Sequence, residues 1–450
     1  MLRFSHQALS WLETILIERF GVGLMLTQGP GYLTLMLRGS DRRIQFESLE
    51  DVFHESRSDF PCHSWRASAE GFGGPIDDKL PAPSSMELPN PLFEFEDGGA
   101  IIRYDILGLA YWMLSRLEEV GRSDLDAHQR FPATASHAHN NGYLERPIVD
   151  EWLSILGQVI QCVWPQLELK QQEFSIRVSH DVDTPSLYAF KSWRMTGRMM
   201  ARHLLKQRDL KAFITAPYVK LATQKQLHRA DPYNTFEWLM DVSEANNLKS
   251  AFYFICGCTN PARDANYEPE HPVIRDLIRR IHERGHEIGL HPSYGTFQNP
   301  LLIKQEADRL KQICAEEGIK QDEWGGRMHY LRWEQPTTLR AWAHAGMSYD
   351  STLGYADRPG FRCGTCHEYP AFDPVAQEQL KLRIRPLVVM ECTVIDEVYL
   401  GLGIGQEAEE RILLLKERCR KVEGTFWLLW HNSYFKMPEL NSMYERVVRV

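Results

Sequence analysis

The sequence has no apolar run long enough to cross a membrane as a helix. Its longest apolar stretches, Phe426–Trp430 and Pro386–Met390, have the length of strands, whereas a membrane-spanning helix needs about 20 apolar residues. A secretory signal is also lacking, because charged residues interrupt Leu9–Phe20 and no small-residue cleavage site follows. We therefore expect a cytoplasmic protein.

The chain also lacks an excess of positive charge. Acidic residues outnumber basic residues by 60 to 51, which gives a formal net charge of −9 and argues against nucleic-acid binding through the overall field. The nine cysteines are an odd number in a large chain without an export signal. They indicate reduced thiols rather than a disulfide framework.

The hydrophobic and charged fractions, 43% and 25%, are typical of a globular protein, and a length of 450 residues is enough for two or three domains. Residues 1–165 predict a smaller α/β domain, with a helix that ends at Phe20 and strands such as Tyr32–Leu37. Phe60–Pro91 is rich in Pro, Gly and Ser, and we expect it to form a long surface loop. No motif indicates a role for this domain.

Residues 173–450 have a different pattern, in which short apolar strands alternate with amphipathic helices. This alternation predicts a parallel sheet, either open or closed into a barrel, with chemistry at the carboxyl ends of the strands. The expected strands are Phe174–Ser179, Ser250–Ile255, His286–Leu290, Gly326–Leu331, Leu387–Val394 and Thr425–Trp430.

Polar side chains gather where four of these strands end. Asp181 and Asp183 share one face because successive strand residues point to opposite sides, and two adjacent carboxylates repel each other unless a cation or a proton lies between them. Each residue alone could be an ordinary polar strand end, but the four ends together favour a functional site. The other members are His291, Arg327, His329 and His431.

These motifs resemble the polysaccharide deacetylase superfamily, the NodB-homology domain, over roughly Glu173 to Tyr434. Ser179-His180-Asp181-Val182-Asp183 is similar to the family's paired-acid motif, and Gly285-His286-Glu287-Ile288-Gly289-Leu290-His291 to its second motif. Arg327-Met328-His329-Tyr330 and Leu428-Leu429-Trp430-His431 resemble the third and last motifs. Residues 1–165 resemble an uncharacterised domain that precedes some members linked to surface-polysaccharide synthesis.

The resemblance implies an α/β fold in which a distorted (β/α)7 barrel, residues 173–450, follows the smaller domain. It implies Asp181 as the catalytic base, Arg327 as the residue that orients it, and His431 as the general acid. It also implies Asp183 and His291 as ligands of a divalent metal, with zinc the favoured ion. The activity would be hydrolysis of an N-acetyl group on a carbohydrate or glycan precursor.

One position departs from the family pattern. The second motif usually supplies two His ligands four residues apart, and here the second position is Gly295. Because a catalytic zinc normally takes three protein ligands, a third must come from elsewhere. His286 lies an odd number of residues before His291, so a regular strand would turn the two apart. We expect His329 as the third ligand, with Tyr294 and His367 as alternatives.

Two other functions stay open at this stage. Without a third ligand, the chain would be a catalytically inactive relative that binds a glycan or a partner. Alternatively, Cys363-Gly364-Thr365-Cys366-His367 matches the attachment motif of c-type haem, although that attachment takes place outside the cytoplasm. The two thiols could also clip a structural zinc, but no second CxxC pair completes four ligands.

A basic segment, residues 191–229, interrupts the second region. It holds ten Lys and Arg against Asp209 as its only acid, and apolar residues such as Trp193 and Leu205 are interspersed. One interpretation is peripheral contact with the inner face of the membrane, where a lipid-linked sugar precursor would be met. The other is a solvated basic insertion.

Overall fold

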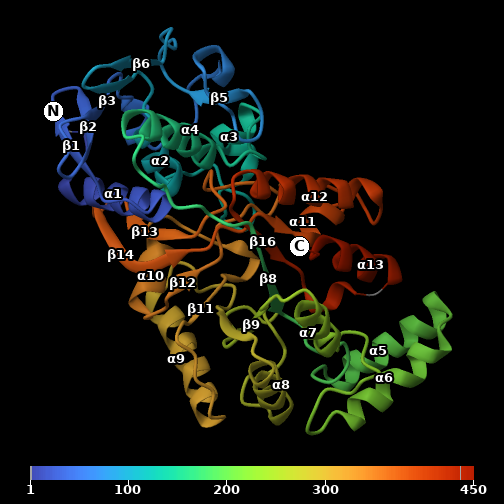
Figure 1. The fold of residues 1–450 in the computed structure, drawn as a ribbon. Helices are drawn as coiled ribbons and strands as arrows, with labels where there is room; N and C mark the ends of the chain where they lie inside the picture. The colour runs from blue at the N-terminus through green and yellow to red at the C-terminus, as the bar shows by residue number, and fades with distance from the viewer. Residues whose placement is uncertain (1–2, 436, 450) are drawn as a thin grey trace.

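A computed structural model describes residues 3–435 and 437–449. Two sheets organise the chain, with the N-terminal sheet on one side and a larger, curled sheet built from the rest (Figure 1). Among the described residues, none of the helices combines the length and the apolar character that crossing a membrane requires.

The N-terminal part is a five-stranded mixed sheet in the order β1-β2-β3-β7-β6, accompanied by a separate β4-β5 hairpin. The hairpin lies inside the segment expected to be a long loop, so that prediction was wrong for residues 62–66 and 79–83. The elements are α1 (His6–Phe20), β1 (Leu24–Gly29), β2 (Tyr32–Leu37), β3 (Arg43–Phe46), β4 (Cys62–Arg66), β5 (Lys79–Pro83), β6 (Phe93–Glu96), β7 (Gly99–Ile102), α2 (Ile106–Leu114), α3 (His137–Asn140) and α4 (Ile148–Val163).

The second part is a nine-stranded sheet in the order β13-β14-β12-β11-β10-β9-β8-β16-β15, and every neighbouring pair except β13–β14 is parallel. Its strands are β8 (Ser175–Val182), β9 (Ala251–Ile255), β10 (Glu287–His291), β11 (Gly325–Gly326), β12 (Tyr349–Asp350), β13 (Tyr369–Asp373), β14 (Glu378–Ile384), β15 (Val389–Met390) and β16 (Thr425–Leu429). Its helices are α5 (Trp193–Arg202), α6 (Leu210–Ala222), α7 (Phe236–Ala245), α8 (Pro272–Glu283), α9 (Pro300–Glu316), α10 (Thr337–His344), α11 (Glu391–Ile395), α12 (Gln406–Lys421) and α13 (Pro438–Val447).

The predicted parallel sheet is confirmed, but the count of seven strands is not reproduced. A hairpin, β13–β14, adds an antiparallel edge strand, and Asp373 begins its turn by accepting hydrogen bonds from the backbone of residues 375 and 376. Two expected strands are also shorter than predicted. The chain turns after Gly326, and the stretch expected as Leu387–Val394 pairs only over Val389–Met390 before α11 begins.

The two parts share one continuous core that runs from Phe4 to Val448. Helix α1 packs against β13 and β14 (Figure 1), and the indole of Trp11 donates a hydrogen bond of 2.8 Å to the carbonyl oxygen of Pro370. The division of the chain into domains 1–165 and 173–450 remains a prediction.

A buried ionic cluster also joins the two parts. Arg116 and Arg362 both bind Glu119, with Arg116 Nε and Arg362 Nε each 2.9 Å from Glu119 Oε1. The side chains of these three residues are no more than 3% exposed. Because Arg362 follows β12 whereas Arg116 and Glu119 follow α2, the cluster fixes one part of the chain against the other.

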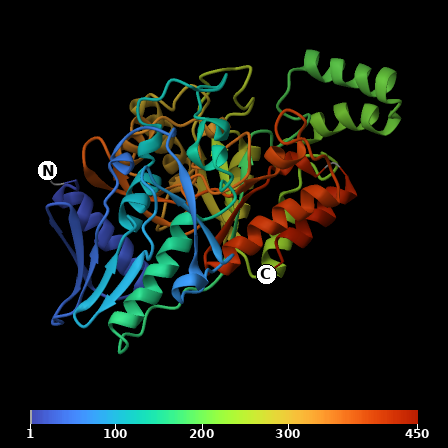
Figure 2. The same cartoon turned by 90° about the horizontal axis from the view of Figure 1, so that it is seen from above.

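A helical hairpin projects from the body of the molecule. It consists of α5, a π-helical turn at His203–Gln207 and α6, and Figure 2 shows it standing away from both sheets. The hairpin occupies most of the basic segment recognised in the sequence.

The ionic cluster predicts a large cost when its shared acid is neutralised. Glu119→Gln leaves two buried guanidinium groups with too little negative charge, and we expect the free energy of unfolding to fall by about 3 to 5 kcal/mol. Urea denaturation measures the change. Glu55→Gln, which removes one of the two exposed partners of Arg57, should cost less than about 1 kcal/mol; equal losses in the two variants would contradict this account.

A second prediction concerns His180, which is fully buried beneath the sheet, with Nδ1 2.6 Å from the carbonyl oxygen of Trp430. Burial lowers the pKa of His180 to about 3, below the 6.5 of an unfolded chain. The unfolded state therefore binds the extra proton, and stability contributed by this residue is lost as pH falls from about 6.5 toward 3.

We expect the free energy of unfolding to decline by roughly 1.4 kcal/mol per pH unit through His180 alone over this range. His180→Phe should flatten the decline by that amount, whatever its effect at neutral pH. Denaturation curves between pH 4 and 7 test the slope, with the exposed His6→Phe as control. A slope unchanged by His180→Phe would mean that the imidazole takes up its proton in the folded protein.

Candidate metal centre

Parallel strand pairing brings the predicted acids and the first histidine together. Asp181 and Asp183 lie at the carboxyl end of β8, β9 pairs with β8, and β10 pairs with β9 and ends at His291. Because the carboxyl ends of parallel strands meet at one edge, these side chains converge. His291 Nε2 lies 3.2 Å from Asp183 Oδ1 and 3.6 Å from Asp181 Oδ2.

His329 reaches the same place by a turn rather than on a strand. The residues after Gly326 leave the sheet, and His329–Leu331 form a 3-10 turn in which Tyr330 and Leu331 have φ angles of 62° and 53°. Such left-handed residues cost roughly 1 to 3 kcal/mol each, and they persist only where their surroundings hold them. The strand alternation expected for Arg327 and His329 was therefore wrong, although both side chains border the site.

Carbonyl oxygens fix the protonation of both imidazoles. His291 Nδ1 lies 2.6 Å from the carbonyl oxygen of Arg327, and His329 Nε2 lies 3.0 Å from that of Arg263. A carbonyl can only accept, so each of these ring nitrogens carries the hydrogen. The other nitrogen of each neutral ring, His291 Nε2 and His329 Nδ1, is left with a bare lone pair.

These two lone pairs face each other and a carboxylate oxygen. His291 Nε2 and His329 Nδ1 are 2.9 Å apart, and His329 Nδ1 is 3.5 Å from Asp183 Oδ1. Asp183 Oδ1 is buried without a hydrogen-bond donor. Three acceptors in contact repel one another unless a cation lies among them, which can be a metal ion or a proton on an imidazole.

The electrostatics of Asp183 agree with this arrangement. Burial alone would raise its pKa, but the imidazoles of His329 and His291 hold the pKa of Asp183 well below its usual range. Burial lowers the pKa of His329 and favours a neutral ring, whereas for His291 the Asp181 and Asp183 carboxylates outweigh burial and raise the pKa. A metal ion or a proton on His291 can therefore supply the positive charge at this contact. An ionised carboxylate and two imidazole nitrogens, all within 4.8 Å of one another, are ligands that zinc and related divalent ions accept.

Asp181 is held by Arg327 next to these ligands. Arg327 Nη1 donates to Asp181 Oδ1 at 2.8 Å, while Nη2 donates to the hydroxyls of Ser179 and Ser351 at 2.8 and 3.0 Å. The guanidinium is 1% exposed and lies 5.1 Å from the ring centre of Tyr253. The pair leaves Asp181 Oδ2 directed at the cavity side, toward His291.

His431 forms an ion pair on the opposite side of Asp183. Its Nδ1 lies 2.6 Å from Glu391 Oε1, and its Nε2 lies 3.7 Å from Asp183 Oδ2. Burial alone would lower its pKa, but the Glu391 carboxylate and its hydrogen bond raise the pKa of His431 to about 10. His431 therefore carries a proton on Nε2 at neutral pH.

The six predicted residues surround a cavity of about 320 Å³, with Arg327 behind Asp181 and the other five in the wall. This volume falls within the range of small-molecule sites. The remaining lining residues are Arg130, Thr184, Arg263, Tyr330, Leu331, Met390, Cys392 and Tyr399.

One residue of the N-terminal part, Arg130, lines the cavity. Arg130 donates from Nη1 to the carbonyl oxygen of Tyr330 at 2.7 Å, inside the left-handed turn, and is itself held by Asp126. From the other side, Arg332 donates to the carbonyl oxygen of His128 at 2.8 Å. The segment that follows α2 thus clamps the turn that carries His329.

The alternative ligands lie elsewhere. His286 accepts a hydrogen bond from the backbone of Ser250 and lies near Glu244. The Tyr294 hydroxyl lies 3.0 Å from His128 Nδ1. His367 lies beside Asp150 in a second group of ligand-type residues. The geometry brings His329, and none of these alternatives, into contact with Asp183 and His291.

The second group, Asp150, Cys366 and His367, already contains its cation. Arg19 forms an ion pair with Asp150 and lies 2.8 Å from His367 Nε2. Asp150 also accepts hydrogen bonds from the side chain of Thr365 and the backbone of Cys366. Donors match acceptors here, in contrast to the facing lone pairs of the first group.

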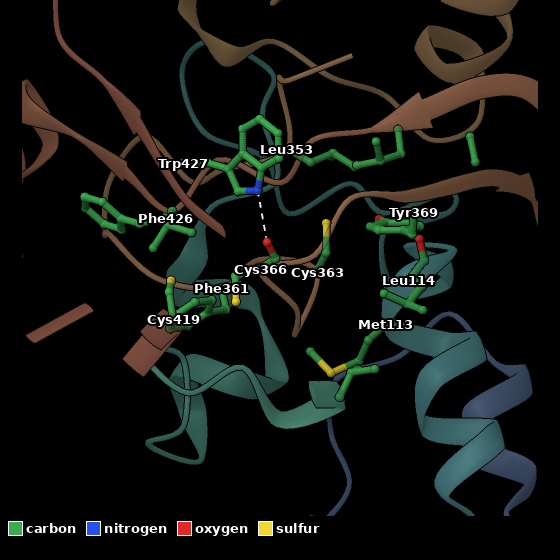
Figure 3. Close-up of a cluster of buried hydrophobic side chains, with 14 of the residues drawn as sticks. Met113, Leu114, Leu353, Phe361, Cys363, Cys366, Tyr369, Cys419, Phe426 and Trp427 are labelled. Atoms are coloured by element: carbon green, nitrogen blue, oxygen red, sulfur yellow. Dashed lines mark hydrogen bonds between the residues drawn. The ribbon is translucent and has the colours of Figure 1, made fainter. Parts of the chain in front are cut away.

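The paired thiols belong to the core. Cys363 and Cys366 are fully buried, and Figure 3 shows them in a packed cluster with Met113, Tyr369 and Trp427. A side chain added at Gly364 would meet Met113 Sδ at 2.7 Å. In this fold both thiols contribute to core packing, and neither is exposed.

The sequence analysis missed Glu391 and Arg130. Glu391 was placed inside an expected strand, where a single acid in the apolar run Pro386–Ile395 was a usable signal for a buried partner. Arg130 offered no such signal, because its contact depends on how the two parts of the chain pack.

Comparison with known proteins gives distant likenesses. Residues 36–165 match the model of DUF7033, a family of unknown function. No curated protein matches the chain.

Solved structures similar to this chain include two described as polysaccharide deacetylases. The first, from Mycobacterium smegmatis, is 16% identical, with a TM-score of 0.40 over 62% of this chain and 84% of its own. The second, from Pseudomonas aeruginosa PAO1, is 15% identical, with a TM-score of 0.33 over 61% and 83%. The Puue allantoinase is 14% identical, with a TM-score of 0.33 over 61% and 82%. The case for an activity rests on the site itself.

Proposed function

We propose that this protein is a metal-dependent hydrolase that removes an N-acetyl group from a carbohydrate or glycan precursor. The observation that carries the proposal is the contact of three acceptors, His291 Nε2, His329 Nδ1 and Asp183 Oδ1, in the wall of a cavity. A held carboxylate and a protonated imidazole flank the same point. This set matches what the family resemblance implies.

The proposed metal ligands are Asp183, His291 and His329. A divalent ion held there, zinc being the favoured one, would supply a Lewis acid and lower the pKa of water. The hydrogen bonds from the two imidazoles to the carbonyl oxygens of residues 327 and 263 orient the rings, as the outer partners of metal-binding histidines usually do.

Asp181 is the proposed general base. Arg327 and the serine hydroxyls around it keep the carboxylate in one rotamer. Asp181 Oδ2 is then free to accept a proton from water beside the scissile amide.

His431 is the proposed general acid. Glu391 holds Nδ1 and stabilises the imidazolium, so that Nε2 presents a proton to the cavity. Transfer of this proton to the departing amine nitrogen would complete hydrolysis, with acetate and a free amino sugar as products.

The proposed setting is the cytoplasm, with the substrate an N-acetylated sugar or a lipid-linked glycan precursor met at the inner membrane face through residues 191–229. A catalytically inactive relative remains the second candidate. Such a protein would have the same fold and bind the same glycan, but it would not hydrolyse it.

Elemental analysis of purified protein, paired with a free-amine assay on N-acetylated sugars, tests the proposal. We expect one divalent ion per chain and release of amine that stops after chelation and returns with zinc. Protein that binds metal without releasing amine from a range of N-acetylated oligosaccharides would favour the inactive relative.

Asp181→Asn separates binding from chemistry. The variant should retain its metal, because Asp181 is not a proposed ligand, and should lose at least about 100-fold in kcat, since a positioned general base contributes that much. Elemental analysis and the amine assay are run on the same sample. His329→Ala is the matched control and should lose metal and activity together; full activity of Asp181→Asn would remove the residue from its role.

Arg130→Ala tests the clamp on the turn that carries His329. Without its hydrogen bond to the Tyr330 carbonyl, the left-handed turn relaxes, and we expect zinc affinity to fall about 10-fold. Calorimetric titration of metal-free protein with zinc measures it. Arg122→Ala, which removes a neighbouring arginine paired with Asp124, should bind zinc as the unmodified protein does. Unchanged zinc affinity in Arg130→Ala would show that the turn does not need Arg130 for its conformation.

A further inference from the structure

Exposed apolar side chains are concentrated on one small part of the surface. Of the 20 large hydrophobic residues that are exposed among the described ones, eight lie between residues 193 and 221. They are Trp193, Met195, Leu204, Leu205, Leu210, Ile214, Tyr218 and Leu221, and Leu205 is 78% exposed. Single exposed hydrophobics are ordinary on a protein surface, whereas a cluster marks a contact site.

The helix α6 is apolar on two faces. One face packs inward through Ala216 and Val219, which form a small cluster with Tyr188 and two methionines of α5. The outer face carries Leu210, Ile214, Tyr218 and Leu221, and these four are 58–64% exposed. Their spacing of four, four and three residues makes a continuous stripe along the helix. Packing within the hairpin therefore leaves this stripe uncovered.

Eight of the ten basic side chains in residues 191–229 have no acidic partner in the part of the chain that the structure describes. Arg194, Arg198 and Arg202 are exposed at intervals of four along α5, and no described residue forms an ion pair or hydrogen bond with their guanidinium groups. The same holds for Lys206, Arg208, Lys211, Lys225 and Arg229. The segment's only acid, Asp209, caps α6 by accepting from the backbone of Ala212.

Arginines on a neighbouring helix of the second part are neutralised. Each of the four arginines on α8 and at its C-terminal end forms an ion pair with an acid of α7, α8 or α9. They are Arg275, Arg279, Arg280 and Arg284. The arginines of the hairpin differ in this respect from those of α8. Residues 191–229 carry +9 within a total of −9, which leaves −18 for the rest of the chain.

We propose that the α5–α6 hairpin binds the surface of an anionic lipid bilayer. The outer stripe of α6 would lie among the acyl chains at the interface, and the arginine row of α5 would face lipid phosphates. Charge complementarity identifies the occupant, because unpaired cations next to exposed apolar side chains match a surface with phosphates above hydrocarbon. A second copy of this chain has the same apolar stripe, but that stripe is accompanied by the same unpaired positive charges. A nucleic acid offers phosphates without a hydrocarbon layer.

The position of the hairpin relates this contact to the cavity. The chain leaves β8 at Val182 and passes Thr184, which lines the cavity, before it enters α5. Asp231 closes the base of the insertion by binding Ser186 and the backbone of Leu187. Bilayer binding would hold the cavity close to lipid-linked material, although the contact itself does not depend on the proposed hydrolysis.

Sedimentation of the full chain with vesicles tests the proposal. We expect binding to vesicles of phosphatidylcholine with one third phosphatidylglycerol, little binding to phosphatidylcholine alone, and weakening at 0.5 M salt. Arg194→Gln/Arg198→Gln/Arg202→Gln should lower the partition coefficient on the order of 100-fold, since each charge contributes roughly fivefold. Leu210→Gln/Ile214→Gln/Leu221→Gln should lower it on the order of 10-fold.

Matched controls carry the same changes elsewhere. Arg38→Gln/Arg43→Gln/Arg66→Gln and Leu301→Gln/Val375→Gln/Val398→Gln replace exposed residues outside the hairpin, and both should bind as the unmodified protein does. Circular dichroism checks that every variant is folded.

Three outcomes would overturn the proposal: no binding of the unmodified protein to anionic vesicles, equal losses in the control variants, or hairpin-dependent self-association in light scattering without lipid. A single-stranded oligonucleotide that competes fully for the hairpin at equal phosphate concentration would identify a nucleic acid as the occupant instead. Amine release assayed with a soluble sugar should be the same in all hairpin variants, so the failure of this proposal and that of the hydrolase are distinguishable.

Discussion

Two backbone carbonyl groups determine what the site can be. The carbonyl oxygens of residues 327 and 263 each accept the hydrogen of one imidazole nitrogen, so when both rings are neutral the opposite nitrogens meet as lone pairs beside Asp183. Hydrogen bonding within the protein cannot satisfy that contact with neutral rings, and a cation can. The rest of the site lies around this contact, with the Asp181 carboxylate held by Arg327 on one side and the charged imidazole of His431 held by Glu391 on the other.

The sequence predicted much of this site because parallel strands bring their ends together. Asp181, Asp183, His291 and His431 all stand at or just after the end of a strand, and strand ends can be recognised from apolar runs and the residues that close them. His180, on the opposite face of β8, is in the core as the alternation requires.

The parts that escaped prediction depend on irregular backbone or on distant packing. His329 was expected on a strand, yet it is positioned by two left-handed residues for which no turn residue such as glycine gives a signal. Glu391 stands at the start of a helix where a strand was expected. The β13–β14 hairpin was not anticipated, and it provides the surface on which α1 packs. In each case the local sequence favoured one backbone conformation, and tertiary contacts stabilised another.

Arg327 orients two residues of the site, one through its side chain and one through its backbone. Its guanidinium orients Asp181, whereas its backbone oxygen orients His291. A change of side chain at this position removes the first task and leaves the second, because every amino acid has the same carbonyl group. Under the proposed function, a substitution of Arg327 would therefore disturb the proposed proton acceptor and leave the orientation of His291 intact, so loss of catalysis would not entail loss of the metal ion.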